Sequence, residues 1–166
     1  MRRLFPMLTL ATGLLVGGAV APAQAALMTR VDGSFGSGGT FDGAVTLQGF
    51  QAQGDRLVAV GTLDGELTDA AGESLGEVRD QPVRLVVNPG SLAASCEQLS
   101  ARLGPTSVQA RSQSVELGAV ELEIGARASR GSRLRELLCG VGEKLGRGAA
   151  ASALASDLDQ VLAALE

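Results

Sequence analysis

The sequence predicts a mainly β domain: an antiparallel sandwich or partial barrel of five to seven strands with two C-terminal helices packed on it. Three observations predict this fold. Apolar and polar residues alternate in several runs between Phe41 and Ile124, glycine-rich turn signals separate these runs, and the apolar spacing becomes helical after Ser132. We expect residues 26–166 to form a single domain, because about 140 residues is a common size for one domain with its own core.

The first 25 residues are predicted to be a cleaved secretory signal. Arg2 and Arg3 supply the basic start, and Leu4–Val20 supplies the apolar run. The small residues that define the cleavage site are Ala23, Ala25 and Ala26, with the cut after Ala25. The alternative is a membrane anchor, but a spanning helix needs about 20 predominantly apolar residues and this run is shorter. The general secretory route and twin-arginine export both stay open.

The segment after the signal begins the β region. Leu27–Gly39 is predicted to be an edge strand or a loose arm. The half-buried strands expected after it are Thr40–Gly49, Leu57–Thr68 and a strand from Ser74 that continues past Pro82 to Val87. The turns between them are expected at Gln53-Gly54-Asp55, Asp69–Gly72 and Asn88-Pro89-Gly90. Short turns between consecutive strands predict an antiparallel meander.

The second half continues the strands and then changes period. Leu99–Leu103 alternates, Gly104-Pro105 interrupts, the pattern resumes at Val115, and Val120–Ile124 shows the cleanest alternation. Helical spacing of leucine and valine predicts helices over residues 132–146 and 151–165. Because their polar faces carry acids and few lysines, packing on the sheet is favoured over binding to a membrane surface.

Cys96 and Cys139 are the only cysteines. In an exported protein an even pair predicts a disulfide, because the periplasm and the extracellular space are oxidising. A bond between them would close a loop of 43 positions, which corresponds to about 4 kcal/mol in the chain-entropy model. The alternative is a reactive thiol, which would lack a histidine to activate it.

The composition excludes several classes of function. The chain has no His, Trp or Tyr, so it lacks imidazole for nucleophile activation or zinc binding and lacks aromatic platforms for sugars or bases. Without Arg2 and Arg3 the net charge is −6, from 12 basic and 18 acidic side chains, which disfavours a nucleic-acid partner. We therefore predict no catalytic residue, no metal site and no cofactor. No second long apolar run follows Ala26, so we expect a mature chain without a membrane span, in the periplasm or outside the cell.

Several local patterns match functional motifs, and each has a structural alternative. Ser74 lies in a Gly-x-Ser-x-Gly match to the nucleophile elbow, but no histidine exists and a hairpin turn is favoured. Glu121 and Glu123 share a strand face as glycosidase acids do, but without aromatic subsites an exposed strand face is the better explanation. Aspartates that suggest calcium ligands are Asp32, Asp42, Asp64 and Asp69; three precede glycine, which is typical of turns.

A cluster of arginines precedes and enters the first predicted helix. Its members are Arg127, Arg130, Arg133 and Arg135. In an otherwise acidic protein this cluster is a candidate interaction patch for an acidic partner or for phospholipid head groups. The alternative is a solvated linker followed by a first helical turn.

Five segments spread over the chain carry a family resemblance. They are Gly39–Gly43, Leu57–Gly65, Cys96–Pro105, Val120–Ile124 and Leu137–Cys139. Together they resemble a family of small exported bacterial proteins of unknown function. The resemblance implies a Cys96–Cys139 pair and no recognised catalytic set. That family usually has leucine and valine after the Gly-Pro, whereas Thr106–Gln113 is polar here, so we expect this segment to be more exposed.

These observations favour an exported, non-catalytic module for binding or envelope structure, whose partner is an envelope protein or a small apolar ligand. The first alternative is a carrier of a small apolar ligand, because glycine-rich curved strands can enclose a cavity that two helices cover. The second alternative is a histidine-free hydrolase that uses carboxylates or Ser74.

Overall fold

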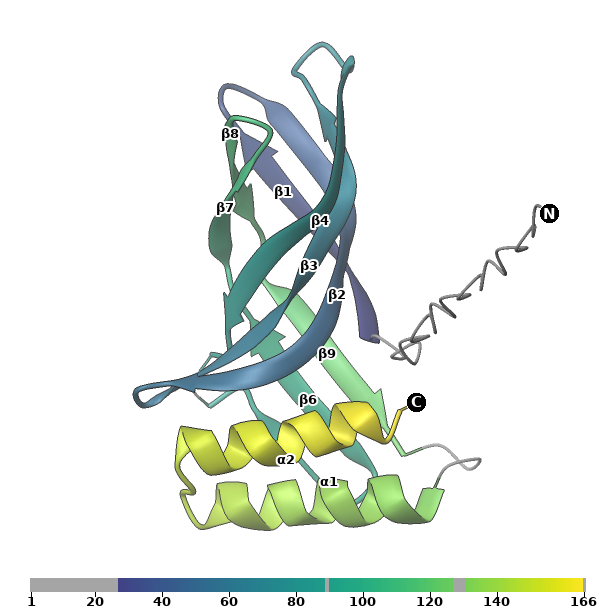
Figure 1. Ribbon diagram of the computed structural model, residues 1–166, viewed down its shortest axis with the longest axis vertical. Coiled ribbons are helices and arrows are strands. Elements are labelled where there is room, and N and C mark those ends of the chain that lie inside the picture. Colours follow the sequence, from purple (N-terminus) through teal and green to yellow (C-terminus); the bar gives the residue numbers. More distant parts are fainter. Residues whose placement is uncertain (1–26, 89, 127–130, 166) are drawn as a thin grey trace, which may run out of the picture.

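The computed structural model describes residues 27–88, 90–126 and 131–165, and it is mainly β with two C-terminal helices, as predicted (Figure 1). The strands are β1 (Leu27–Phe35), β2 (Gly39–Gln53), β3 (Arg56–Thr68), β4 (Ser74–Val86), β5 (Ala93–Ala94), β6 (Gln98–Leu103), β7 (Thr106–Ala110), β8 (Gln113–Leu117) and β9 (Val120–Gly125). The helices are α1 (Gly131–Gly146) and α2 (Ala151–Ala163). The predicted signal with Ala23, Ala25 and Ala26, and Arg127 and Arg130 of the arginine cluster, lie outside the described residues.

Two antiparallel sheets together form a nearly closed barrel. One has six strands in the order β4-β3-β2-β1-β8-β7, and the other has three in the order β5-β6-β9. β6 leads into β7 across Gly104-Pro105, and β8 leads into β9 across Gly118-Ala119. Each of these strand pairs therefore acts as one long wall segment. The result is the partial barrel that the alternation predicts, with nine described strands where five to seven are expected.

The wall closes at two seams, and each is paired along only part of its length. β1 pairs with β8 at Gly33 and Ser34, and beyond this point β1 and β9 diverge. The chain after β4 meets β6, where Val87 bridges Leu103. Sheet edges that are covered or paired in this way do not offer long free strands to other chains.

The inner face of every wall segment contributes to one apolar core. Its largest fully buried barrel residues are Phe41, Leu63, Leu67, Leu85, Leu99, Leu103 and Leu117. They belong to a single cluster that also includes the inner faces of both helices. Among the described residues, no polar or charged side chain is buried. Burial of this apolar surface is the main stabilising term, at about 25 cal/mol per Å².

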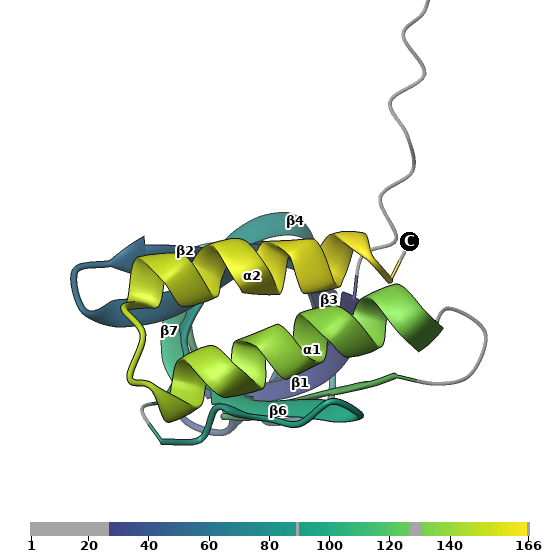
Figure 2. The same ribbon diagram turned by 90° about the horizontal axis from the view of Figure 1, so that it is seen from below.

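The two helices lie side by side across one end of the barrel (Figure 2). α1 begins at Gly131, one residue before the predicted start, and α2 ends at Ala163, two residues before the predicted end. α2 buries Leu154, Leu158 and Val161, as its spacing predicts. Neither described helix is long and apolar enough to cross a membrane.

Three contacts fix the helices in place. The predicted disulfide joins Cys96 to Cys139 of α1, with a Cα–Cα distance of 4.2 Å. Asp159 of α2 accepts a hydrogen bond at 2.7 Å from the backbone N–H of Phe50, next to a bulge in β2. A third contact, the ion pair between Lys144 and Asp157, joins the two helices to each other.

Candidate functional site

Four carboxylates form a continuous row on the outer face of the barrel. Asp32 on β1 lies opposite Asp42 on β2. Asp42 in turn lies opposite Glu66 on β3, and Glu66 lies opposite Glu77 on β4. All four side chains are exposed, and directly opposite residues have Cβ atoms about 4.5–5.5 Å apart. We call these four residues the acidic row.

The inner face of the same strands explains why glycine recurs beside the row. Gly43 and Gly65 lie opposite each other in β2 and β3, and the Phe41 ring covers both. A Cβ atom on Gly43 would lie 2.6 Å from the ring, and one on Gly65 would lie 2.5 Å from it. Since side chains alternate along a strand, the residues before these glycines, Asp42 and Asp64, point outward.

The interpretation of the Asp-Gly pairs as turns is wrong, whereas the strands predicted over Thr40–Gly49 and Leu57–Thr68 are confirmed and contain two of these pairs. Asp32-Gly33 lies inside β1, Asp42-Gly43 inside β2 and Asp64-Gly65 inside β3. Only Asp69 follows the expectation, because it lies in the β3–β4 turn and its Oδ1 accepts a hydrogen bond from the N–H of Ala71 at 2.8 Å. Gly43 and Gly65 make room for the Phe41 ring, and Gly33 lies against Val115 and Leu117, so close packing inside the sheet outweighs the local turn preference of Asp-Gly.

Arg30 pairs with Asp42, the second residue of the acidic row. Its Nη2 lies 2.6 Å from Oδ2 of Asp42, and both side chains remain mostly exposed. The hydrogen bond from Arg30 to Asp42 raises the pKa of the guanidinium group, and the charges of Asp42 and Asp32 raise that pKa further. The pair is thus a surface contact that salt will weaken.

Glu66 holds one of the two inner positions in the row, next to Asp42. It lies between Asp42 and Glu77, and it forms no ion pair with any residue that the structure describes. Glu77 is paired with Arg79, whose Nε donates to Oε2 at 2.8 Å. Since like charges directly opposite each other destabilise a sheet, the position of Glu66 opposes folding.

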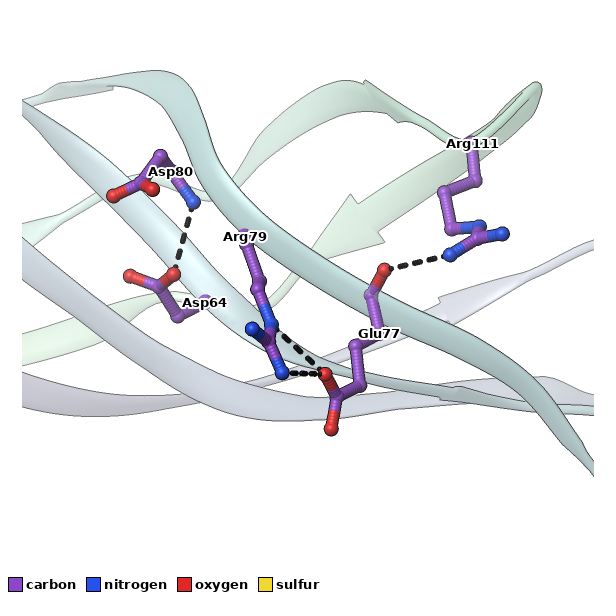
Figure 3. Close-up of polar contacts among 5 residues, drawn as sticks. All are labelled: Asp64, Glu77, Arg79, Asp80 and Arg111. Carbon is purple, nitrogen blue, oxygen red and sulfur yellow. Dashed lines mark hydrogen bonds and ion pairs between the residues drawn. The ribbon is translucent and has the colours of Figure 1, made fainter.

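Figure 3 shows how β4 is held next to the row. Asp80 has a positive φ of 50° at an irregularity in the β3–β4 register, and its N–H donates to Oδ1 of Asp64 at 2.9 Å. Arg111, from the turn between β7 and β8, donates to the carbonyl oxygen of Glu77 at 3.1 Å. The residues that line a pocket of about 380 Å³ here are Asp42, Asp64, Gly65, Glu66, Glu77, Val78 and Arg79.

The acidic row suits electrostatic contact with a cation-bearing molecule. It is exposed and runs across four neighbouring strands, so a positively charged surface can approach several carboxylates together. The described part of the chain contains no group of three or more acidic or cysteine side chains placed to hold a metal ion. The aspartates that suggest calcium from the sequence are therefore spread along the sheet and do not converge on one point.

Ser74 and the acids Glu121 and Glu123 lie on different strands, β4 and β9. Ser74 begins β4 at the hairpin end of the barrel, and its Oγ accepts a hydrogen bond from the N–H of Gly76 at 3.3 Å. Glu121 and Glu123 lie on β9, nearer the helices (Figure 1). Glu121 lies opposite Arg102, so it is the acid of an ordinary opposite-charge pair across two strands.

The described part of the arginine cluster lies at the helical end of the molecule. Arg133 and Arg135 are both exposed on α1. Arg135 lines a pocket of about 650 Å³ together with Glu97 and Glu123. The structure thus places these arginines away from the acidic row, and their role as an interaction patch stays a prediction.

The acidic row itself is missing from the sequence prediction. Alternation treats each aspartate separately, because it gives the face of a residue and leaves its cross-strand neighbour undefined. A signal is nevertheless present in the three Asp-Gly pairs, which recur in consecutive strands joined by short turns. If consecutive strands are paired antiparallel, starting at the turn that joins them, the Asp-Gly pairs fall on neighbouring positions of adjacent strands.

Comparisons with family models, with curated proteins and with solved structures find no match for this chain.

Proposed function

We propose that this protein is an exported, non-catalytic binding module that contacts a basic surface of a partner protein through the acidic row. The observation that carries the proposal is the register that sets three like-charge pairs side by side across four strands. A local arrangement that opposes folding without a structural gain points to a role in function. The expected partner is an exported or envelope protein with clustered lysine or arginine.

Export is supported by two features. The N-terminal sequence has the order of a secretory signal, with the proposed cut after Ala25. The disulfide between Cys96 and Cys139 is consistent with an oxidising compartment.

The contact test compares two double variants with the same change in net charge. Asp32→Asn with Glu66→Gln alters the acidic row, and Glu121→Gln with Glu123→Gln alters β9. The binding of a fluorescein-labelled oligo-arginine peptide is followed by fluorescence anisotropy. We expect the row variant to bind several-fold more weakly and the β9 variant to bind almost as wild type. Equal losses in both variants would show that net charge alone attracts the peptide and would contradict the proposal.

A separate experiment tests whether the protein is non-catalytic or is the hydrolase of the second alternative. The wild-type protein is assayed on ester, phosphate and glycoside substrates beside Ser74→Ala and Glu121→Gln. We expect no turnover above that of a heat-denatured sample. Turnover that Ser74→Ala or Glu121→Gln removes would replace the binding module with a histidine-free hydrolase.

A further inference from the structure

A second pocket lies at a corner between the barrel and the helices, far from the acidic row. Four segments meet there: the β2–β3 turn, the chain after β4, the α1–α2 linker and the start of α2. The pocket has a volume of about 370 Å³, within the range of about 300–1,000 Å³ of small-molecule sites. We call it the corner pocket.

Apolar side chains form most of its wall. They are Leu57, Val87, Leu92, Leu145, Ala151 and Leu154. Leu57, Val87 and Leu154 are buried, and the other three are half-buried at the edge of the core. Half-buried apolar surface gains free energy when it is removed from water, so this wall favours an apolar guest.

The wall on the barrel side is held by a network of hydrogen bonds. Val87 N–H donates to the carbonyl oxygen of Leu57 at 2.9 Å. The Ser91 hydroxyl donates to the carbonyl oxygen of Asn88 at 2.7 Å and accepts from Arg102 N–H at 3.0 Å. The chain after β4 is thus fixed against β3 and β6, so the barrel side of the pocket is formed before any ligand binds.

The helical wall is fixed in a similar way. Ala149 N–H in the linker donates to the carbonyl oxygen of Lys144 at 3.0 Å. The Lys144 ammonium group then contacts the Asp157 carboxylate of α2, with an Nζ–Oδ1 distance of 2.8 Å. These contacts hold the end of α1 and the start of α2 together at the pocket.

The mouth of the corner pocket carries polar groups without partners. Arg56 is exposed, and neither its guanidinium group nor the Asn88 side-chain amide makes a hydrogen bond or ion pair to a described residue. Both groups can donate hydrogen bonds to one acceptor. Arginine binds carboxylates well because two of its N–H groups match the two carboxylate oxygens. The negative charge of Asp55 at the same mouth will weaken the binding of an anionic ligand, but Arg56 and Asn88 remain available as donors.

We propose that the corner pocket binds a small amphipathic carboxylate, with an apolar tail against Leu92 and Leu154 and the carboxylate group at Arg56 and Asn88. This site goes beyond the proposed function, because it uses none of the acidic row. If the protein carries a small ligand, this proposal puts the ligand in the corner pocket. The inside of the barrel is filled by the core side chains.

The test uses three probes with unbranched alkyl tails of nearly equal length that differ in the head group: decanoate, decanol and decyltrimethylammonium. Binding to the mature protein is measured from amide shifts in ¹H–¹⁵N spectra. We expect decanoate to bind most tightly and to shift Leu57, Leu92 and Leu154. Equal affinity for all three probes would overturn the carboxylate assignment. Shifts confined to barrel residues such as Leu63 and Leu117 would overturn the corner pocket.

Variants separate the head group from the tail. Arg56→Gln should weaken decanoate about fivefold and leave decanol unchanged, while Asp55→Asn should tighten decanoate. The control Arg84→Gln changes an exposed arginine on β4 outside the pocket and should have no effect. An equal loss of decanoate affinity in Arg56→Gln and Arg84→Gln would show that net charge alone causes the loss, and it would contradict the proposal.

The tail is tested by filling the pocket. Ala151→Phe should abolish binding of decanoate and decanol, whereas Ala163→Phe, on an exposed position of α2, should abolish neither. If Ala151→Phe lowers the unfolding midpoint strongly, Ala149→Leu in the linker replaces it with the same expected loss. Full binding by a folded pocket-filled variant would overturn the site.

Discussion

On the inner face of β2 and β3, packing is close: Phe41 is 1% exposed and its ring covers two opposing glycines. On the outer face, one residue further along each strand, Asp42 and Glu66 oppose each other as like charges. The inner face satisfies the rules of stable packing and the outer face breaks the rule for cross-strand pairs. The two faces differ because the core fixes the register, and the register then brings the charges together.

The largest expected effect comes from removing the ring that defines the inner face. Phe41→Ala leaves Gly43 and Gly65 without a covering side chain, so a cavity opens in the core. We expect the free energy of unfolding, measured with urea, to fall by about 3–5 kcal/mol. A fall of less than about 1 kcal/mol would show that the two glycines serve another purpose.

The next effect comes from filling the same space from the glycine side. In Gly65→Ala the new Cβ would lie 2.5 Å from the Phe41 ring and closer still to the carbonyl oxygen of Asp42. We expect a loss of about 1–3 kcal/mol in unfolding free energy. Gly125→Ala is the control, because a Cβ atom there would meet nothing within 4 Å beyond its own chain neighbours; an equal loss there would contradict the packing argument.

A smaller effect is expected from salt, which screens exposed charges, including those of the outer face. Raising the ionic strength from 0.01 M to 1 M shortens the Debye length from about 30 Å to about 3 Å. The repulsion around Glu66 should weaken, so wild type should gain more stability from NaCl than Glu66→Gln does. The same gain in both proteins would mean that the acidic row carries no net repulsion.

The sequence predicts much of the fold because alternation and helical spacing depend on local residue order. Val120–Ile124 and the apolar face of α2 are confirmed residue by residue. The polar stretch Thr106–Gln113 gives only a weak signal of β7, because Val108 and Ala110 are its only apolar residues; Val108 is half-buried against the core and Ala110 is fully buried. The break at Gly104-Pro105 hides the continuity of β6 and β7.

The candidate site cannot be predicted in the same way because it depends on register between strands. Asp42 and Glu66 are far apart in the chain, and only the pairing of β2 with β3 makes them neighbours. The corner pocket likewise joins four segments whose contact arises from tertiary packing. By contrast, the Cys96–Cys139 bond is accessible from the sequence, because two cysteines allow only one intramolecular pair and the N-terminal sequence predicts an oxidising compartment.

The most direct test of the central claim, that the acidic row opposes folding, is the unfolding free energy of Glu66→Gln at low ionic strength. Glu121→Gln is the matched control, since it makes the same change in net charge but removes the partner of Arg102. We predict that Glu66→Gln is more stable than wild type by a few tenths of a kcal/mol up to about 1 kcal/mol and that Glu121→Gln is not. A Glu66→Gln variant that is equal to or less stable than wild type would contradict the claim.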